Sequence, residues 1–83
     1  MAGPPNELWN GQPDRLADGF TMTKSKGDRT SIATCEVWTN PNGWELRLLT
    51  DGQSLIATVV PSADEMHVLI EMWRAALLKM GWS

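Results

Sequence analysis

The 83-residue sequence has one cysteine, one histidine and no apolar run near the roughly 18 residues of a membrane-spanning helix. Cys35 therefore cannot form an intramolecular disulfide, which is the usual staple of small secreted domains. The first residues have neither the basic start nor the apolar segment of a secretory signal. These absences predict a protein without a transmembrane segment that works in the cytoplasm or an equivalent reducing compartment.

Residues suited to catalysis or metal binding are equally scarce. His67 and Glu71, one helical turn apart, and the distant Cys35 supply too few ligands for a typical metal site. Cys35 is expected on an apolar face and His67 on a polar one, so they do not form a nucleophile and base pair. Glu36 and Glu45 are expected on an exposed strand face rather than in a cleft. We expect no catalytic residue, no metal, no cofactor and no enzyme activity.

The chain has little positive charge. Its formal net charge is -3 and its isoelectric point is near 4.9. Residues 1–31 carry four acidic and four basic residues, so the acidic excess lies entirely in residues 32–83. A dedicated polyanion-binding protein normally has a basic face, and this balance argues against one.

The N-terminal part lacks the pattern of regular structure. Residues 1–19 contain three prolines, three glycines and two asparagines, a composition that predicts a flexible segment. The pattern of residues 13–20 is compatible with one helical turn. If the segment docks loosely on the rest of the protein, Leu8 and Trp9 are its plausible anchors. Residues 20–83 are expected to form a single small α+β domain.

Short runs rich in β-branched and apolar residues predict strands over 31–39, 44–50 and 53–60. Residues 20–24 are a candidate fourth strand, joined to the next by a hairpin loop in which Gly27 takes a positive φ. The other turns are expected at "NPNG", residues 40–43, and at Asp51 with Gly52. The register expected from these turns pairs Val37 with Leu46, Cys35 with Leu48, Glu36 with Arg47, Leu49 with Ser54, Leu48 with Leu55, Leu46 with Ala57 and Trp44 with Val59.

The last part of the chain predicts one long helix over about residues 63–80. Ser62 is a typical N-cap, Glu65 completes a capping box, and Gly81 is a typical stop. The predicted fold is therefore an antiparallel meander of three or four strands packed on one C-terminal helix. The helix face expected to cover the sheet comprises Met66, Leu69, Ile70, Trp73, Ala76, Leu77 and Met80.

The predicted helix and sheet carry more apolar surface than this one contact uses. The surplus residues either contact the N-terminal segment, stay exposed, or pack on another molecule. We favour the last alternative, a small non-enzymatic interaction or regulatory module that acts as a homodimer or binds another protein. The expected interface residues are Val68, Met72, Ala75 and Trp82 on the helix and Trp38, Leu49 and Ile56 on the sheet, where Val60 shares their face.

A second hypothesis is a protein that binds single-stranded nucleic acid. In this alternative an aromatic side chain stacks on bases and nearby cations contact phosphates. The residues would be Lys24, Lys26, Arg29, Trp38 and Arg47. The predicted topology, a meander followed by one long helix, resembles that of a family of homodimeric coactivators that bind single-stranded DNA. The acidic Glu36 and Glu45, expected on the same face as Trp38, disfavour this alternative.

Overall fold

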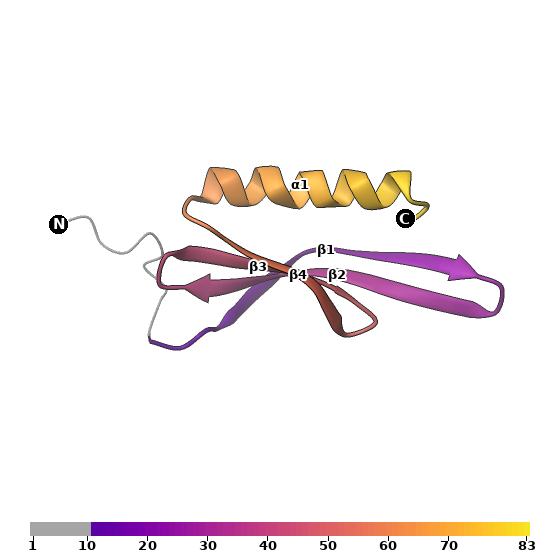
Figure 1. Ribbon diagram of the computed structural model, residues 1–83, viewed down its shortest axis with the longest axis horizontal. Helices are drawn as coiled ribbons and strands as arrows, with labels where there is room; N and C mark the ends of the chain where they lie inside the picture. The colour runs from indigo at the N-terminus through magenta and orange to yellow at the C-terminus, as the bar shows by residue number, and fades with distance from the viewer. Residues whose placement is uncertain (1–10) are drawn as a thin grey trace.

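The computed structural model describes residues 11–83, which form four strands followed by one α-helix (Figure 1). The strands pair in chain order as one antiparallel sheet. This confirms the predicted α+β fold, a meander packed on one C-terminal helix. The elements are β1 (Arg15–Lys26), β2 (Arg29–Asn40), β3 (Gly43–Thr50), β4 (Gln53–Val60) and α1 (Ala63–Lys79).

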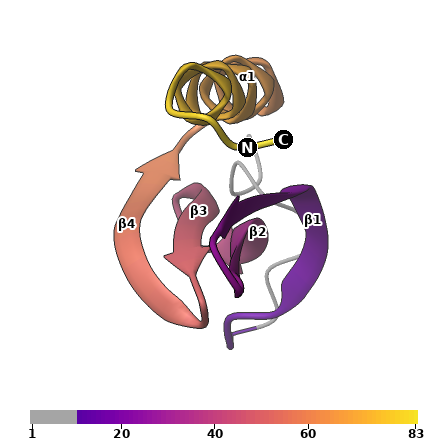
Figure 2. The same cartoon turned by 90° about the vertical axis from the view of Figure 1, so that its right-hand side faces the viewer.

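The sheet is strongly curved, and α1 lies along its concave side. Seen from one end, β1 and β4 rise on opposite sides toward the helix (Figure 2). The hairpin of β1 and β2 extends beyond the other strands, because β3 pairs with β2 only from Ala33 to Asn40. Residues 23–32 at the end of that hairpin, which we call the hairpin arm, therefore project from the sheet (Figure 1).

The turn chemistry predicted from the sequence is confirmed in all three hairpins. Gly27 has a φ of 64°, and Asp51 and Gly52 have φ values of 51° and 82°, as a tight turn with two positive φ angles requires. Asn40 pairs with Gly43 across the second turn. The predicted β2–β3 register follows from this turn and is confirmed in the pairs Val37 with Leu46, Cys35 with Leu48 and Glu36 with Arg47.

A β-bulge makes the predicted β3–β4 register wrong beyond the turn. Leu49 pairs with Ser54 as predicted, but Leu48 pairs with Ile56, so that Leu55 is the extra residue of the bulge. The pairs predicted further along are shifted by one residue, to Leu46 with Thr58 and Trp44 with Val60.

This shift exchanges the two faces of β4, because side chains alternate along a strand. Ile56 and Val60, which were expected on the far side of the sheet, share the helix side with Leu48. Ala57 and Val59 were expected in the core and instead lie on the far side, where both are exposed. Leu55 was also expected in the core and is exposed.

The first strand begins earlier than the composition of residues 1–19 suggested. β1 starts at Arg15, so the helical turn considered for residues 13–20 is wrong, whereas the candidate strand over 20–24 is confirmed. Bulges at Leu16 and Gly19 interrupt the pairing with β2. A Cβ atom on Gly19 would lie 3.1 Å from Cδ1 of Ile70, so glycine lets β1 pass closely under the helix. The predicted anchors Leu8 and Trp9 lie outside the described residues.

Two clusters of buried side chains form the core between α1 and the sheet. Phe20 and Trp73 pack against both clusters and so connect them. Most of the predicted helix face is confirmed, but Ala76 is exposed and Met80 is 58% exposed. Trp82 packs on that end of the core instead. The clusters consist of Met22, Ala33, Leu48 and Leu77 and of Cys35, Val37, Leu46 and Ile70.

Substitution of Gly43 by alanine should destabilise the fold far more than the same change at Gly27. A Cβ on Gly43 would overlap the carbonyl oxygen of Val60 and lie 2.9 Å from the Cα of Pro61. Gly27 also has a positive φ, but the space around it is open. We expect Gly43→Ala to lower the free energy of unfolding by about 3 kcal/mol and Gly27→Ala by about 1 kcal/mol. Urea unfolding followed by tryptophan fluorescence measures both; equal losses would contradict this account of Gly43.

Candidate functional site

The turn after α1 places Trp82 beside the hairpin arm. The amide of Trp82 donates to the carbonyl of Leu77 at 3.0 Å and the amide of Gly81 to that of Leu78 at 3.2 Å, which together form a Schellman motif. Gly81 takes the positive φ of 95° that this motif requires. Trp82 then packs against the cluster that contains Leu77.

Two further contacts fix the C-terminal end to β1. The backbones of Thr23 and Ser83 exchange hydrogen bonds of 2.8 and 2.9 Å, as neighbouring strands do. The Nζ atom of Lys24 donates to the carbonyl oxygen of Met80 at 2.8 Å. A cation at this position offsets the negative end of the helix dipole. The position of Trp82 is therefore determined from both sides, by the helix and by β1.

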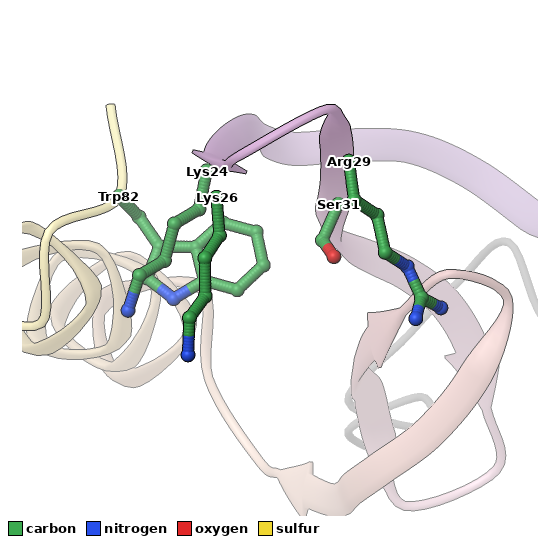
Figure 3. Close-up of a pocket in the computed structure, with 5 residues that line it drawn as sticks. All are labelled: Lys24, Lys26, Arg29, Ser31 and Trp82. Carbon is green, nitrogen blue, oxygen red and sulfur yellow. The ribbon is translucent and has the colours of Figure 1, made fainter.

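A basic pocket of about 390 Å³ opens between this turn and the hairpin arm. The side chains at 24 and 26 follow Met22 in the alternation of β1 and so lie on the helix side. Figure 3 shows the two lysines beside the indole of Trp82, and Arg29 and Ser31 of β2 across from them. The lining residues are Lys24, Lys26, Arg29, Ser31 and Trp82.

The cations of this pocket differ from the arginines elsewhere in the described part of the chain. Arg15, Arg47 and Arg74 each lie within ion-pair distance of a carboxylate. Among residues 11–83, no carboxylate lies within that distance of Lys26 or Arg29, and none lines the pocket. The protein is acidic overall, and yet Lys26 and Arg29 at this end have no ion-pair partner among residues 11–83.

The far side of the sheet has a different arrangement, in which Trp38 is already engaged. Its Nε1 atom donates to Glu36 at 2.9 Å, and the guanidinium carbon of Arg47 lies 4.1 Å from the centre of its ring. The Nε atom of Arg47 donates to Glu45 at 2.5 Å. The two carboxylates balance this face, so an incoming phosphate would meet negative charge beside Arg47.

The structure therefore divides the residues predicted to bind nucleic acid. The three cations of the hairpin arm lie together, whereas Trp38 and Arg47 lie on the opposite face of the sheet. Trp82, which we expected in a protein interface, accompanies the three cations. The strand predicted over residues 20–24 ended too early. Had it been extended to residue 26, the alternation of side chains would have placed Lys24 and Lys26 on the same face as Met22. No local signal shows that Trp82 folds back onto that face.

The predicted interface residues also divide between surfaces. Val68 and Met72 are 59% and 60% exposed, and with Ala75 they line a shallow depression on the outer side of α1. Ile56 is exposed on the helix side of β4. Leu49 and Trp38 are half-buried on the far side of the sheet, and Trp82 is half-buried in the core.

A cleft of about 570 Å³ separates the start of α1 from β1. His67 and Glu71 line it together with Asp18, but residues 11–83 contain no group of three or more side chains that could hold a metal ion. Cys35 is fully buried beneath the helix. Burial, and to a smaller extent the nearby Asp18 and Glu36 carboxylates, raises the pKa of the Cys35 thiol from 9.0 to about 11. The thiol is therefore protonated and unreactive near neutral pH.

Comparison of the chain with protein-family models, with curated proteins and with solved structures found no match. Within residues 11–83, no helix is both long and apolar enough to cross a membrane.

The raised pKa of Cys35 predicts a loss of stability at alkaline pH. Because the folded state holds the thiol proton more tightly than the unfolded state does, this contribution is complete below about pH 9 and is lost as the pH rises through about 11. The two-unit difference corresponds to about 2.7 kcal/mol at most. Cys35→Ala has no thiol to ionise. Its free energy of unfolding should therefore rise relative to that of the wild type as the pH increases from about 9 to about 11.

Urea unfolding of both proteins across this range measures the difference. A constant difference between wild type and Cys35→Ala would contradict the raised pKa. A thiol reagent provides a second measurement, because it should react with Cys35 much faster after unfolding than before.

Proposed function

We propose that the protein is a small non-enzymatic interaction module that acts as a homodimer in a reducing compartment such as the cytoplasm. The observation that carries this proposal is the contrast between the two edges of the sheet. One edge is protected against pairing with another strand. The other edge is uncharged, and no strand among residues 11–83 covers it.

β1 has several features that prevent a strand of another molecule from pairing with it. Bulges at Leu16 and Gly19 make the strand irregular. Ser83 forms hydrogen bonds with the backbone of Thr23 at the edge, and charged residues occur along the strand. Bulges, charges and covering segments are the usual means by which monomeric proteins avoid association through an edge strand.

β4 has little of this protection. Its sequence, "QSLIATVV", contains no charged residue and no proline, and only one strand of the described chain pairs with it. The single bulge lies at Leu55, next to the turn, so Ile56–Val60 is regular. When two copies of a strand pair about a two-fold axis, each copy presents the same residues to the other. An uncharged strand pairs in this way without bringing like charges together, which matters for a protein of net charge -3.

Part of the apolar surplus of α1 lies on the side from which such a partner would approach. His67 and Glu71 line the cleft beside β1, so they mark the flank of the helix that faces that strand. At 3.6 residues per turn, Met72 and Ala76 lie on the opposite flank, toward β4. Antiparallel pairing of two β4 strands would put both helices on one side of a continuous sheet. Met72 would then lose its exposure to water against the second copy, whereas Val68 and Ala75, on the outer side of α1, would not.

Light scattering on a size-exclusion column, over a wide concentration range, tests the proposal. We expect the wild type to elute as a dimer, and Met72→Glu and Val59→Lys to weaken the dimer about tenfold or more, since each adds a charge of the same sign to both sides of the proposed interface. Leu78→Glu is the matched control, because Leu78 is also exposed but lies on the flank of Glu71. Circular dichroism checks that the variants remain folded.

A wild type that stays monomeric at every concentration would contradict the proposal. So would a dimer that Leu78→Glu weakens as much as Met72→Glu does.

A further inference from the structure

The basic pocket at the hairpin arm presents donors that no group of the described protein uses. Among residues 11–83, the indole N–H of Trp82 and the hydroxyl of Ser31 have no hydrogen-bond acceptor, and Lys26 and Arg29 have no acidic partner. All these side chains line one opening (Figure 3). Charged donors such as these form strong hydrogen bonds with phosphate and carboxylate groups, so the opening is suited to an anion.

The pairing of β1 with β2 brings two of the cations into an unfavourable position. Lys26 and Arg29 are directly opposite each other across the turn, and like charges in this position destabilise a hairpin. The only acidic residue of the turn, Asp28, does not line the pocket. An anion bound beside the two cations would remove their repulsion. The ends of the two side chains diverge, which leaves space between them (Figure 3).

Lys24 makes the pocket suitable for an anion although the carboxyl end of a helix lies next to it. The last carbonyl groups of a helix carry partial negative charge and repel anions. Lys24 donates to the carbonyl of Met80 and so compensates this charge at the side of the pocket. Lys24 is therefore a positioning residue, and Lys26 and Arg29 remain for the ligand.

Trp82 indicates which kind of anion fits. Part of the indole packs on the core and part lines the pocket, so an apolar aromatic surface lies beside the cations. A nucleic-acid strand combines phosphates with flat bases, and bases that are not paired in a duplex stack on aromatic side chains. The volume of about 390 Å³ is in the range of small-ligand sites. An acidic peptide would also use the cations, but every nucleotide brings a flat base for the indole together with its phosphate.

We infer that this pocket binds a nucleotide unit of a single-stranded nucleic acid, with backbone phosphates at Lys26 and Arg29 and the base against Trp82. All the lining residues belong to one chain, so the inference does not depend on the proposed dimer.

Fluorescence anisotropy with a labelled single-stranded oligonucleotide, at low and moderate salt, tests the inference on the full chain. The double variant Lys26→Ala, Arg29→Ala should bind at least tenfold more weakly. It should also lower the slope of log affinity against log salt by about 1.4, because each phosphate contact on a single strand contributes about 0.7. Trp82→Phe keeps an aromatic ring in the core and should weaken binding without changing the salt slope.

The matched control is Arg74→Ala, Lys79→Ala, which removes the same charge from the helix surface outside the pocket. This control should bind like the wild type. Three results would overturn the inference: no binding of the single strand at low salt, an equal loss in the control variant, or equal affinity for a duplex of the same sequence. A mononucleotide, inorganic phosphate or anionic lipid vesicle that competes as well as the oligonucleotide would also overturn it, by identifying a different anion.

Discussion

The contact between α1 and the concave side of the sheet is the interaction on which the rest of the structure depends. Among residues 11–83, no other element covers that side, and both buried clusters lie there. Phe20 and Trp73 pack against both clusters, so the two halves of the core are stabilised together. In a chain of 83 residues the net stability amounts to only a few kcal/mol, so this contact cannot be weakened much without unfolding.

The same contact explains why the two ends of the molecule differ. Where α1 begins, the sheet has all four strands beneath it, and the cleft beside β1 contains His67 and Glu71. Where α1 ends, only the hairpin arm continues, and the C-terminal turn of the helix closes onto it. The basic pocket forms at this second end. The pocket therefore exists because α1 is long enough to reach the hairpin arm, which extends beyond β3 and β4. No contiguous sequence motif forms it.

Much of the fold could be predicted because local rules determine it. Ser62 is the expected N-cap of α1, because its hydroxyl accepts from the amide of Glu65, and Gly81 ends the helix. The Glu65 carboxylate accepts from the hydroxyl of Ser62 rather than from its backbone amide, as a full capping box would require. The turn at residues 40–43 determines the β2–β3 register. The bulges at Leu16 and Leu55 could not be predicted, because a leucine within an apolar strand carries no local signal for a bulge. Gly19 is a typical bulge residue, but the composition of residues 1–19 had not predicted a strand there. One missed bulge was enough to reverse the faces of β4.

The sequence by itself determined the order of the elements, the three hairpin turns and most of the buried face of the helix, since these follow from spacing along the chain. Only the tertiary structure decided which residues meet across long separations. It separated Lys24, Lys26 and Arg29 from Trp38 and brought Trp82 to them instead. The reason is physical: a Schellman turn reverses the chain and Ser83 pairs with Thr23, 60 positions earlier in the sequence, so these neighbours exist only after the helix has docked on the sheet.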